Sequence, residues 1–294
     1  PSGPKVAAEA LDPLCRPADS GPMTSLSGET PSCAGDTPRA FPGFGQGLLL
    51  VLFVWLGIAL AAVIVTLVTS LPAGSLDPPP QAVLLLIANT AAFAVVTVLA
   101  WRRTGQRPGA VFPLRPVRAV LLAPILPIAL GGVAVLAQLD GLLRLLPAPE
   151  WWNGILRMID ETMVAMVRES IWSSAVVLVV MAPLTEEFFF RGLILHGFCR
   201  RYPRGKAVVL SALLFAVTHL TPNQLLSAFA IGLFLAWITL ETASLWPALA
   251  THAVVNATAL ASIDLGAPSP QAPAPPELLP WWVAAAGLAA LAVG

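Results

Sequence analysis

Long apolar runs, separated by short polar or proline-rich segments, fill the chain from residue 47 onward. Each run is apolar on every side, and about 20 such residues form a helix long enough to cross a bilayer. Two of the runs are shorter than this, so the number of spans is approximate. The pattern predicts an all-α, polytopic integral membrane protein with about eight transmembrane helices. The runs are 47–71, 81–101, 120–139, 171–198, 207–220, 224–240, 245–262 and 279–294.

Two segments depart from this pattern. Residues 1–44 are rich in proline, serine, glycine and threonine and contain no periodic apolar run, so they are predicted to be a disordered tail. Residues 141–170 mix acidic, basic and apolar side chains at helical spacing and include Trp151 and Trp152. This composition is typical of an amphipathic helix that lies at the membrane interface, with both tryptophans at the level of the headgroups.

The composition places the chain in a bilayer rather than in water. Hydrophobic residues make up 57% of the chain and charged residues 11%, whereas about 25% of an average soluble domain is charged. The mean hydropathy is +0.80. The 16 basic and 16 acidic residues cancel, so nucleic acid is not an expected partner. The expected partner is the lipid bilayer.

Basic residues gather in two of the predicted loops and set the orientation of the chain. One loop follows the second run and the other follows the fourth, which places both loops on the same side of the membrane. Because Lys and Arg favour the cytoplasmic side, both chain ends are predicted to be cytoplasmic. The bias toward arginine, alanine, proline and leucine is typical of a GC-rich genome, so we expect a bacterial plasma membrane. The basic loop residues are Arg102, Arg103, Arg107, Arg115, Arg118, Arg200, Arg201, Arg204 and Lys206.

Three of the predicted spans carry polar groups that are costly in lipid. An ionisable side chain at mid-bilayer costs about 2.5–3.5 kcal/mol on insertion scales, so such residues are functional candidates. At about 1.5 Å per residue, the polar groups of all three spans fall at overlapping depths. A shared water-filled cavity explains this alignment. The residues are Glu186, Glu187 and Arg191 in the fourth run, His219 in the fifth, and His252 and Asn256 in the seventh. Phe215, four residues before His219, is expected to be a packing or lipid-facing residue.

Helical spacing separates the roles of the two acidic residues. Glu187 and Arg191 are four residues apart, so they share a helix face and can neutralise each other. Glu186 projects about 100° away around the helix and lacks this partner. A carboxylate without a cationic partner in a low dielectric is a candidate general base. His252 and Asn256 are also four residues apart and share a face.

This set of side chains suits two kinds of chemistry. A carboxylate and a neutral imidazole can together activate a water, while a second imidazole and an amide donate hydrogen bonds to a developing oxyanion. Alternatively, Glu186, Glu187, His219 and His252 could hold a zinc ion and a water. The chain contains no HExxH motif, the usual sequence signature of zinc peptidases.

These residues resemble the intramembrane endopeptidases of the CAAX protease and bacteriocin-processing (CPBP) family, which includes the type II CAAX prenyl endopeptidase. The family pattern is EExxxR, then FxxxH, then HxxxN on successive core helices. All three motifs are present here in that order, and the resemblance covers about residues 170–262. The matching residues are Glu186, Glu187 and Arg191, then Phe215 and His219, then His252 and Asn256.

The resemblance implies a role for each of these residues. Glu186 would be the general base, assisted by His219, and would act on a water. His252 and Asn256 would stabilise the oxyanion, while Glu187 and Arg191 would support the helix. Members of the family have been classed as metalloproteases, but the resemblance favours a glutamate-dependent reaction that requires no cofactor, with zinc as the alternative.

Two functions from different classes fit the sequence. One is an intramembrane endopeptidase that cleaves a membrane-associated, prenylated CAAX-like or bacteriocin-type peptide. The other is a non-enzymatic membrane protein, either an immunity or scaffold protein or a proton-coupled carrier. The polar residues lie only in the C-terminal half and no internal repeat is evident, which favours the enzyme over a carrier. The expected domains are a tail (1–44), helices one to three (45–140), an interfacial segment (141–170), a catalytic core (171–262), and a linker with the last helix (263–294).

Overall fold

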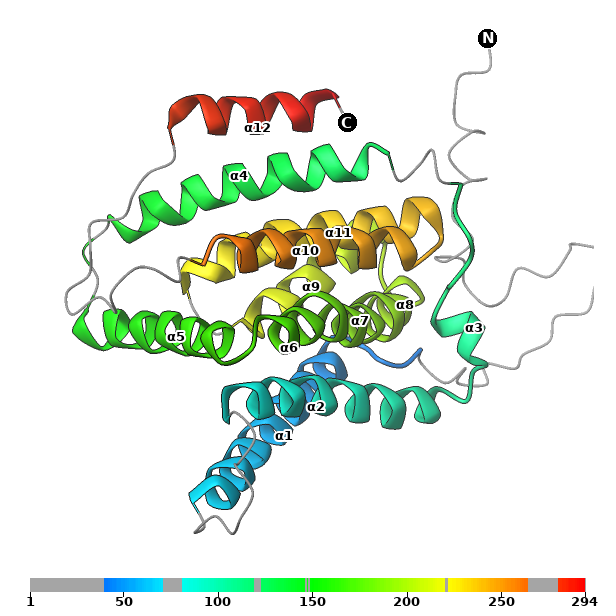
Figure 1. Ribbon diagram of the computed structural model, residues 1–294. Coiled ribbons are helices and arrows are strands. Elements are labelled where there is room, and N and C mark those ends of the chain that lie inside the picture. The colour runs from blue at the N-terminus through cyan, green and yellow to red at the C-terminus, as the bar shows by residue number, and fades with distance from the viewer. Residues whose placement is uncertain are drawn as a thin grey trace, which may run out of the picture.

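The computed structural model describes residues 40–70, 81–118, 123–145, 147, 149–219, 222–263 and 280–293. Every regular element among these residues is a helix (Figure 1). The first five are α1 (Phe44–Ser70), α2 (Gln81–Thr104), α3 (Pro108–Val111), α4 (Ile125–Arg144) and α5 (Glu150–Glu169). A continuous rod follows, made of α6 (Ile171–Ala175), η2 (Val176–Met181), α7 (Ala182–Glu187), η3 (Phe188–Ile194) and α8 (Leu195–Cys199). The last four are α9 (Arg204–Val217), α10 (Pro222–Thr242), α11 (Trp246–Ala261) and α12 (Trp281–Val293).

All eight predicted runs form helices in the described residues, which confirms the all-α membrane class. Within the described part of the chain, five helices are long and apolar enough to cross a bilayer: 44–70, 83–104, 127–144, 171–199 and 224–242. The runs 207–220, 245–262 and 279–294 form α9, α11 and α12. These helices have 14, 16 and 13 residues and are shorter than the 18 residues required of a candidate span. The number of spans therefore stays at five by this measure, and the count of eight remains a prediction.

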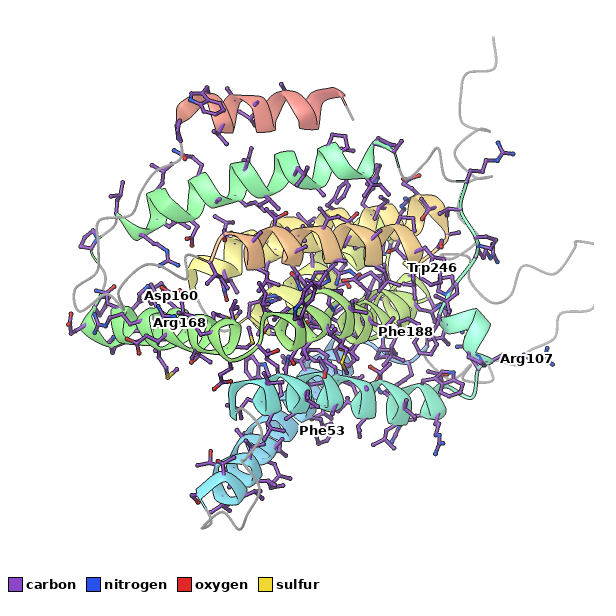
Figure 2. The ribbon with its side chains drawn as sticks, in the orientation of Figure 1. Phe53, Arg107, Asp160, Arg168, Phe188 and Trp246 are labelled. Carbon is purple, nitrogen blue, oxygen red and sulfur yellow. The ribbon has the colours of Figure 1, made fainter. Side chains whose placement is uncertain are left out.

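The rod from α6 to α8 lies at the centre of the bundle (Figure 1). On one side it packs against α2, which in turn packs against α1. On the other side it contacts α9, α10 and α11, while α4 and α12 pack together outside α11. This arrangement surrounds the acidic residues of the rod with helices. Side chains of the rod and of the helices packed on it fill the space between them (Figure 2).

The rod is not a regular α-helix. Two π-helical segments, η2 and η3, flank α7, and Pro183 stands at the second position of α7. Proline has no N–H and its ring clashes with the carbonyl four residues earlier, so it disrupts an α-helix from within. A wider π turn directly before it relieves this clash, and π segments of this kind are frequent at functional sites.

The main apolar core surrounds the second half of the rod. Phe189, Phe190, Leu193 and Phe198 are completely buried and pack with residues of α1, α2 and α9. The outer surface of α1 is different, since leucines such as Leu56 and Leu60 are more than half exposed. In a bilayer this surface faces lipid, because the chains of lipids are as apolar as leucine.

The structure does not test the predictions for the N-terminal tail, the linker before the last helix and the membrane position of the mixed-charge segment. The predicted disordered tail and the linker before the last helix fall largely on residues outside the described part of the chain. The mixed-charge segment does form a helix, α5, with Met166 and Val167 buried and Trp151 exposed. Its placement at the membrane interface, like the division into domains, remains a prediction.

Candidate active site

Three parts of the fold contribute the polar residues of the predicted site. The rod supplies Glu186 and Glu187 at the end of α7 and Arg191 in η3, and α11 supplies His252 and Asn256. His219 follows the last turn of α9. Because α11 packs directly on α7 and η2, its polar face meets that of the rod.

Glu187 is the centre of a buried charge network. Its Oε1 lies 3.1 Å from Nη1 of Arg191 and 2.8 Å from Nδ1 of His252. The side chains of Glu187 and Arg191 are fully buried. Nη2 of Arg191 also donates to the carbonyl of Gly232 on α10, at 3.3 Å. The predicted ion pair between residues 187 and 191 is therefore present, and it extends to a histidine that sequence spacing did not connect with it.

Glu186 projects away from this network, as its position on the helix predicts. Its Oε2 lies 3.9 Å from Nε2 of His252. This oxygen is buried and has no hydrogen-bond partner among the described residues, while the side chain as a whole is 13% exposed. One ring nitrogen of His252 thus faces Glu187 and the other faces Glu186.

His219 has a defined tautomer in its neutral form. Its Nδ1 lies 3.0 Å from the carbonyl oxygen of Phe215. A carbonyl oxygen can only accept a hydrogen bond, so Nδ1 carries the hydrogen. Nε2 of the neutral ring is then left with a lone pair and can accept a proton.

The ring of Phe215 contacts both imidazoles and the guanidinium of Arg191. Its ring centroid lies 4.8 Å from that of His219 and 5.7 Å from that of His252, in edge-on geometry. Cζ of Arg191 lies 4.3 Å from the same centroid. The sequence suggested only packing or lipid contact for this residue. The ring is 1% exposed and packs within the site, so the lipid-facing alternative is wrong. Its spacing of four residues from His219 was the available signal.

Asn256 is partly buried and bonded to the rod. Its Nδ2 donates to the carbonyl oxygen of Leu178 in η2, at 2.9 Å. An amide nitrogen carries two hydrogens, and this bond uses one of them. The amide therefore has a fixed orientation and a second hydrogen for another acceptor.

The comparison with protein families gives one match. Residues 168–258 match the family described as type II CAAX prenyl endopeptidase Rce1-like. This match covers 91 of the 294 residues and shows what this segment is similar to. The comparisons with curated proteins and with solved structures gave no match. The Rce1-like segment contains the rod, α9, α10 and most of α11, and therefore all of the polar residues described above.

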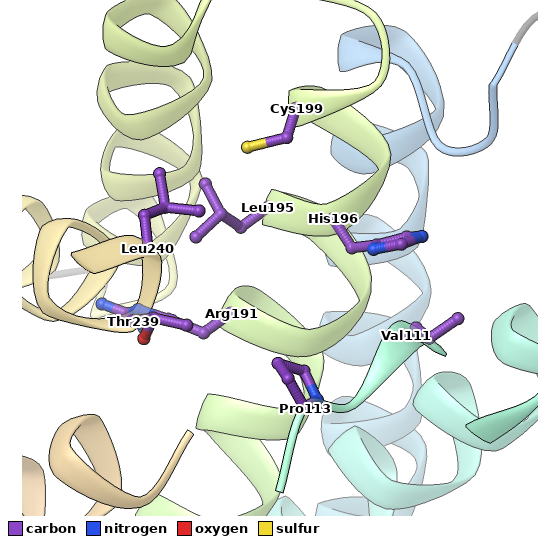
Figure 3. Close-up of a pocket in the computed structure, with 8 residues that line it drawn as sticks. All are labelled: Val111, Pro113, Arg191, Leu195, His196, Cys199, Thr239 and Leu240. Atoms are coloured by element: carbon purple, nitrogen blue, oxygen red, sulfur yellow. The ribbon is translucent and has the colours of Figure 1, made fainter. Parts of the chain in front are cut away.

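The third histidine of the chain lies outside this network. Nε2 of His196 is 3.1 Å from Oε1 of Gln106, a hydrogen bond that ties α8 to the segment after α2. A cavity of about 10 Å³ lies beside it (Figure 3). Such a volume has room for about one water, so it is too small for a substrate. The lining residues are Val111, Pro113, Arg191, Leu195, His196, Cys199, Thr239 and Leu240.

A larger cavity adjoins the Rce1-like segment where the rod meets α2. Its volume is about 320 Å³ and its walls are almost entirely apolar. Thr185 and Phe188, which line it, are the residues directly before and after the two acids. An apolar cavity is therefore in contact with the helical turn that carries the charge network. The lining residues are Ala94, Thr97, Val98, Trp101, Phe112, Leu184, Thr185 and Phe188.

The candidate zinc ligands do not form a metal site in the described part of the chain. No group of three or more His, Cys, Asp or Glu side chains there is arranged to hold a metal ion. Oε1 of Glu187 and Nδ1 of His252 are hydrogen-bonded to each other, and that oxygen also pairs with Arg191. This bond leaves Nε2 of His252, Glu186 and His219 as the remaining candidate ligands, because a zinc-bound histidine commonly donates its other N–H to a carboxylate. Dependence on zinc, or independence of it, remains a prediction.

Proposed function

We propose that this protein is an intramembrane endopeptidase of the CAAX type, and that Glu186 is its general base. One observation carries the proposal. Oε1 of Glu187 is engaged with Arg191 and His252, whereas Glu186 makes no such hydrogen bond among the described residues, and its buried Oε2 lies 3.9 Å from Nε2 of His252. The Rce1-like match supports the class of reaction.

The proposed reaction begins with a water held between Glu186 and His219. Glu186 takes a proton from this water, assisted by the lone pair on Nε2 of His219. The resulting hydroxide attacks the carbonyl carbon of the scissile peptide bond and forms a tetrahedral oxyanion. The carbon–nitrogen bond then breaks, and the proton held by Glu186 passes to the leaving amine. General acid–base catalysis of this kind contributes about 10²–10⁴-fold to a rate.

His252 and Asn256 are the proposed oxyanion donors. Since Nδ1 of His252 is directed to Glu187, Nε2 can donate only when the ring carries both protons. With that second proton in place, the fixed ring presents its Nε2–H to the oxyanion beside Glu186. The second amide hydrogen of Asn256 completes the pair of donors.

The substrate we propose is a membrane-associated peptide with an apolar attachment. The cavity of about 320 Å³ between α2 and the rod is lined almost entirely by apolar atoms and borders the turn of the two acids. It can receive a prenyl chain or an apolar side chain next to the scissile bond. A prenylated CAAX-like peptide uses this cavity, and a bacteriocin-type peptide is the second candidate. We further propose a bacterial plasma membrane and cytoplasmic chain ends.

The test is a cleavage assay on the purified full chain in proteoliposomes. The substrates are matched fluorogenic peptides with and without a C-terminal prenyl-cysteine, and a leader-type peptide without one. We expect the wild type to cleave the prenylated peptide and Glu186→Gln to lose at least about 10²-fold in kcat. His219→Gln should fall in a similar range.

Matched control variants come from the same chain. Glu241 pairs with Arg204 on the exposed surface, so Glu241→Gln removes a carboxylate outside the site. His196 is bonded to Gln106, so His196→Gln is the matched histidine variant. Both should retain wild-type kcat. Equal activity in wild type and Glu186→Gln, or no cleavage of any of the peptides, would refute the proposed function.

A further inference from the structure

The carbonyl of Leu178 stands at an unusual point of the rod. In η2, the N–H of Ala182 donates to the carbonyl of Val177, five residues earlier. If this five-residue pattern continued, the N–H of residue 183 would donate to the carbonyl of Leu178. Residue 183 is proline, which has no N–H. Leu178 is therefore deprived of both backbone donors that a helix offers, because the N–H of Ala182 is used elsewhere and that of Pro183 does not exist.

The side chain of Asn256 occupies this acceptor. Its Nδ2 lies 2.9 Å from the oxygen of Leu178, across 78 positions of the sequence. A buried carbonyl that loses its backbone donor costs free energy unless another donor replaces it. The amide of Asn256 is the donor that does so, and the bond also decides which end of the amide faces η2.

We propose that Pro183 is a positioning residue for Asn256. By leaving the carbonyl of Leu178 without a backbone donor, it creates the acceptor that holds one amide hydrogen of Asn256 and aims the other. The catalytic consequence rests on the proposed function, in which Asn256 donates to the oxyanion. The hydrogen-bond relationship itself does not depend on that function.

The substitution Pro183→Ala separates this role from a general effect on the helix. Alanine restores an N–H that can bond within the rod, so it competes with Asn256 for Leu178 or closes the π turn. Alanine is also a far better helix former than proline, so the variant is expected to fold. Pro183→Ser restores the same N–H and serves as the second variant. Pro127→Ala, in the first turn of α4 away from the site, is the matched control.

The experiment is a double-mutant cycle of Pro183→Ala with Asn256→Ala. Removal of one oxyanion donor costs about 10²–10³ in kcat, and we expect Asn256→Ala to fall in this range. Pro183→Ala should lose about 10-fold or more in kcat with KM unchanged, and it should add nothing in the Asn256→Ala background. Wild-type kcat in both Pro183 variants, or effects that multiply in the double variant, would overturn the proposal.

A second readout does not involve catalysis. The thermal midpoints of the same four proteins in detergent report whether the two residues are coupled. We expect the destabilisation caused by Asn256→Ala to be smaller in the Pro183→Ala background, because the new N–H satisfies Leu178 there. Additive shifts would count against the proposal. A chain that cleaves no peptide but shows this coupling would refute the proposed function while leaving the Pro183–Asn256 relationship intact.

Discussion

Glu187 and His252 are joined by a hydrogen bond of 2.8 Å between Oε1 and Nδ1, across 65 positions of the sequence. The bond connects the rod to α11, and the same oxygen also pairs with Arg191. One carboxylate atom thereby fixes the ring that faces Glu186. Glu187 is therefore more than a neutralising partner for Arg191, because it also sets the direction of the imidazole.

Loss of this carboxylate should unfold the site. In Glu187→Gln the guanidinium of Arg191 stays buried without its counter-charge. Removal of one partner from a buried ion pair costs about 3–5 kcal/mol. Unfolding of the purified protein by denaturant in detergent measures this loss. Glu241→Gln, which breaks an exposed pair with Arg204, should cost about 1 kcal/mol or less. Equal losses in the two variants would contradict the charge network.

Removal of both charges should be milder than the single losses suggest. Arg191→Met alone leaves Glu187 buried with only His252 as partner, and should destabilise as strongly as Glu187→Gln. The double variant has no uncompensated charge, so its loss of unfolding free energy should be smaller than the sum of the single losses by at least about 1 kcal/mol. The same denaturant titration gives all four values. Strict additivity would show that the two side chains do not interact.

The ring of Phe215 should matter more than a typical phenylalanine of this chain. Phe215→Ala removes a buried ring that contacts both imidazoles and Arg191, and we expect a loss of about 3–5 kcal/mol in stability. Phe53 is 49% exposed on α1, so Phe53→Ala should cost about 0.5 kcal/mol or less. A comparable loss in both variants, measured by unfolding in detergent, would argue against a central position for Phe215.

Activity should survive removal of metal ions. The proposed reaction uses Glu186 and His219 to activate water without a metal ion, and the described residues contain no group of three arranged as a metal site. We expect the chelator-treated protein, checked by elemental analysis, to retain its kcat. Loss of cleavage on chelation with recovery on addition of zinc would instead establish a metal-dependent reaction.

The arginine-rich loop after α2 should lie in the cytoplasm. Arg107 is exposed beyond the end of α2, and Ser70 is exposed at the opposite end of the α1–α2 pair. With the native cysteines replaced by serine, Arg107→Cys should react with a membrane-impermeant thiol reagent only in inside-out vesicles. Ser70→Cys should react only in right-side-out vesicles. The reverse pattern would invert the predicted orientation.

The sequence was sufficient to predict the helical class and a set of polar residues that the structure brings close together; their catalytic roles remain predictions. Spacing of four residues correctly predicted the ion pair between Glu187 and Arg191, because both lie on one helix. It could not predict that Glu187 rather than Glu186 bonds to His252. That choice depends on the rotation of α11 against the rod, which packing between helices decides. The bond of Asn256 to Leu178 has the same origin.

The number of spans follows less directly from the sequence than the helical class does. Apolar composition alone made α9, α11 and α12 look like spans, yet these helices end after 14, 16 and 13 residues. Apolar composition indicates that a helix is surrounded by lipid or by other helices. The length of a helix depends instead on the position of the caps and turns at its ends. The π segments were also beyond prediction, since Pro183 signals only that a regular α-helix is interrupted there.

Each π segment of the rod amounts to a one-residue insertion in an α-helix, because its wider turn takes in one residue more. That wider turn absorbs the extra residue, so the turns before and after it keep nearly the orientation of a regular α-helix. A further insertion that is not absorbed in this way would rotate everything before it by about 100° relative to α7, and the carbonyl that holds Asn256 would turn away from α11. The register of this helix is thus part of the site: the rod tolerates changes of side chain in η2 more readily than changes of length.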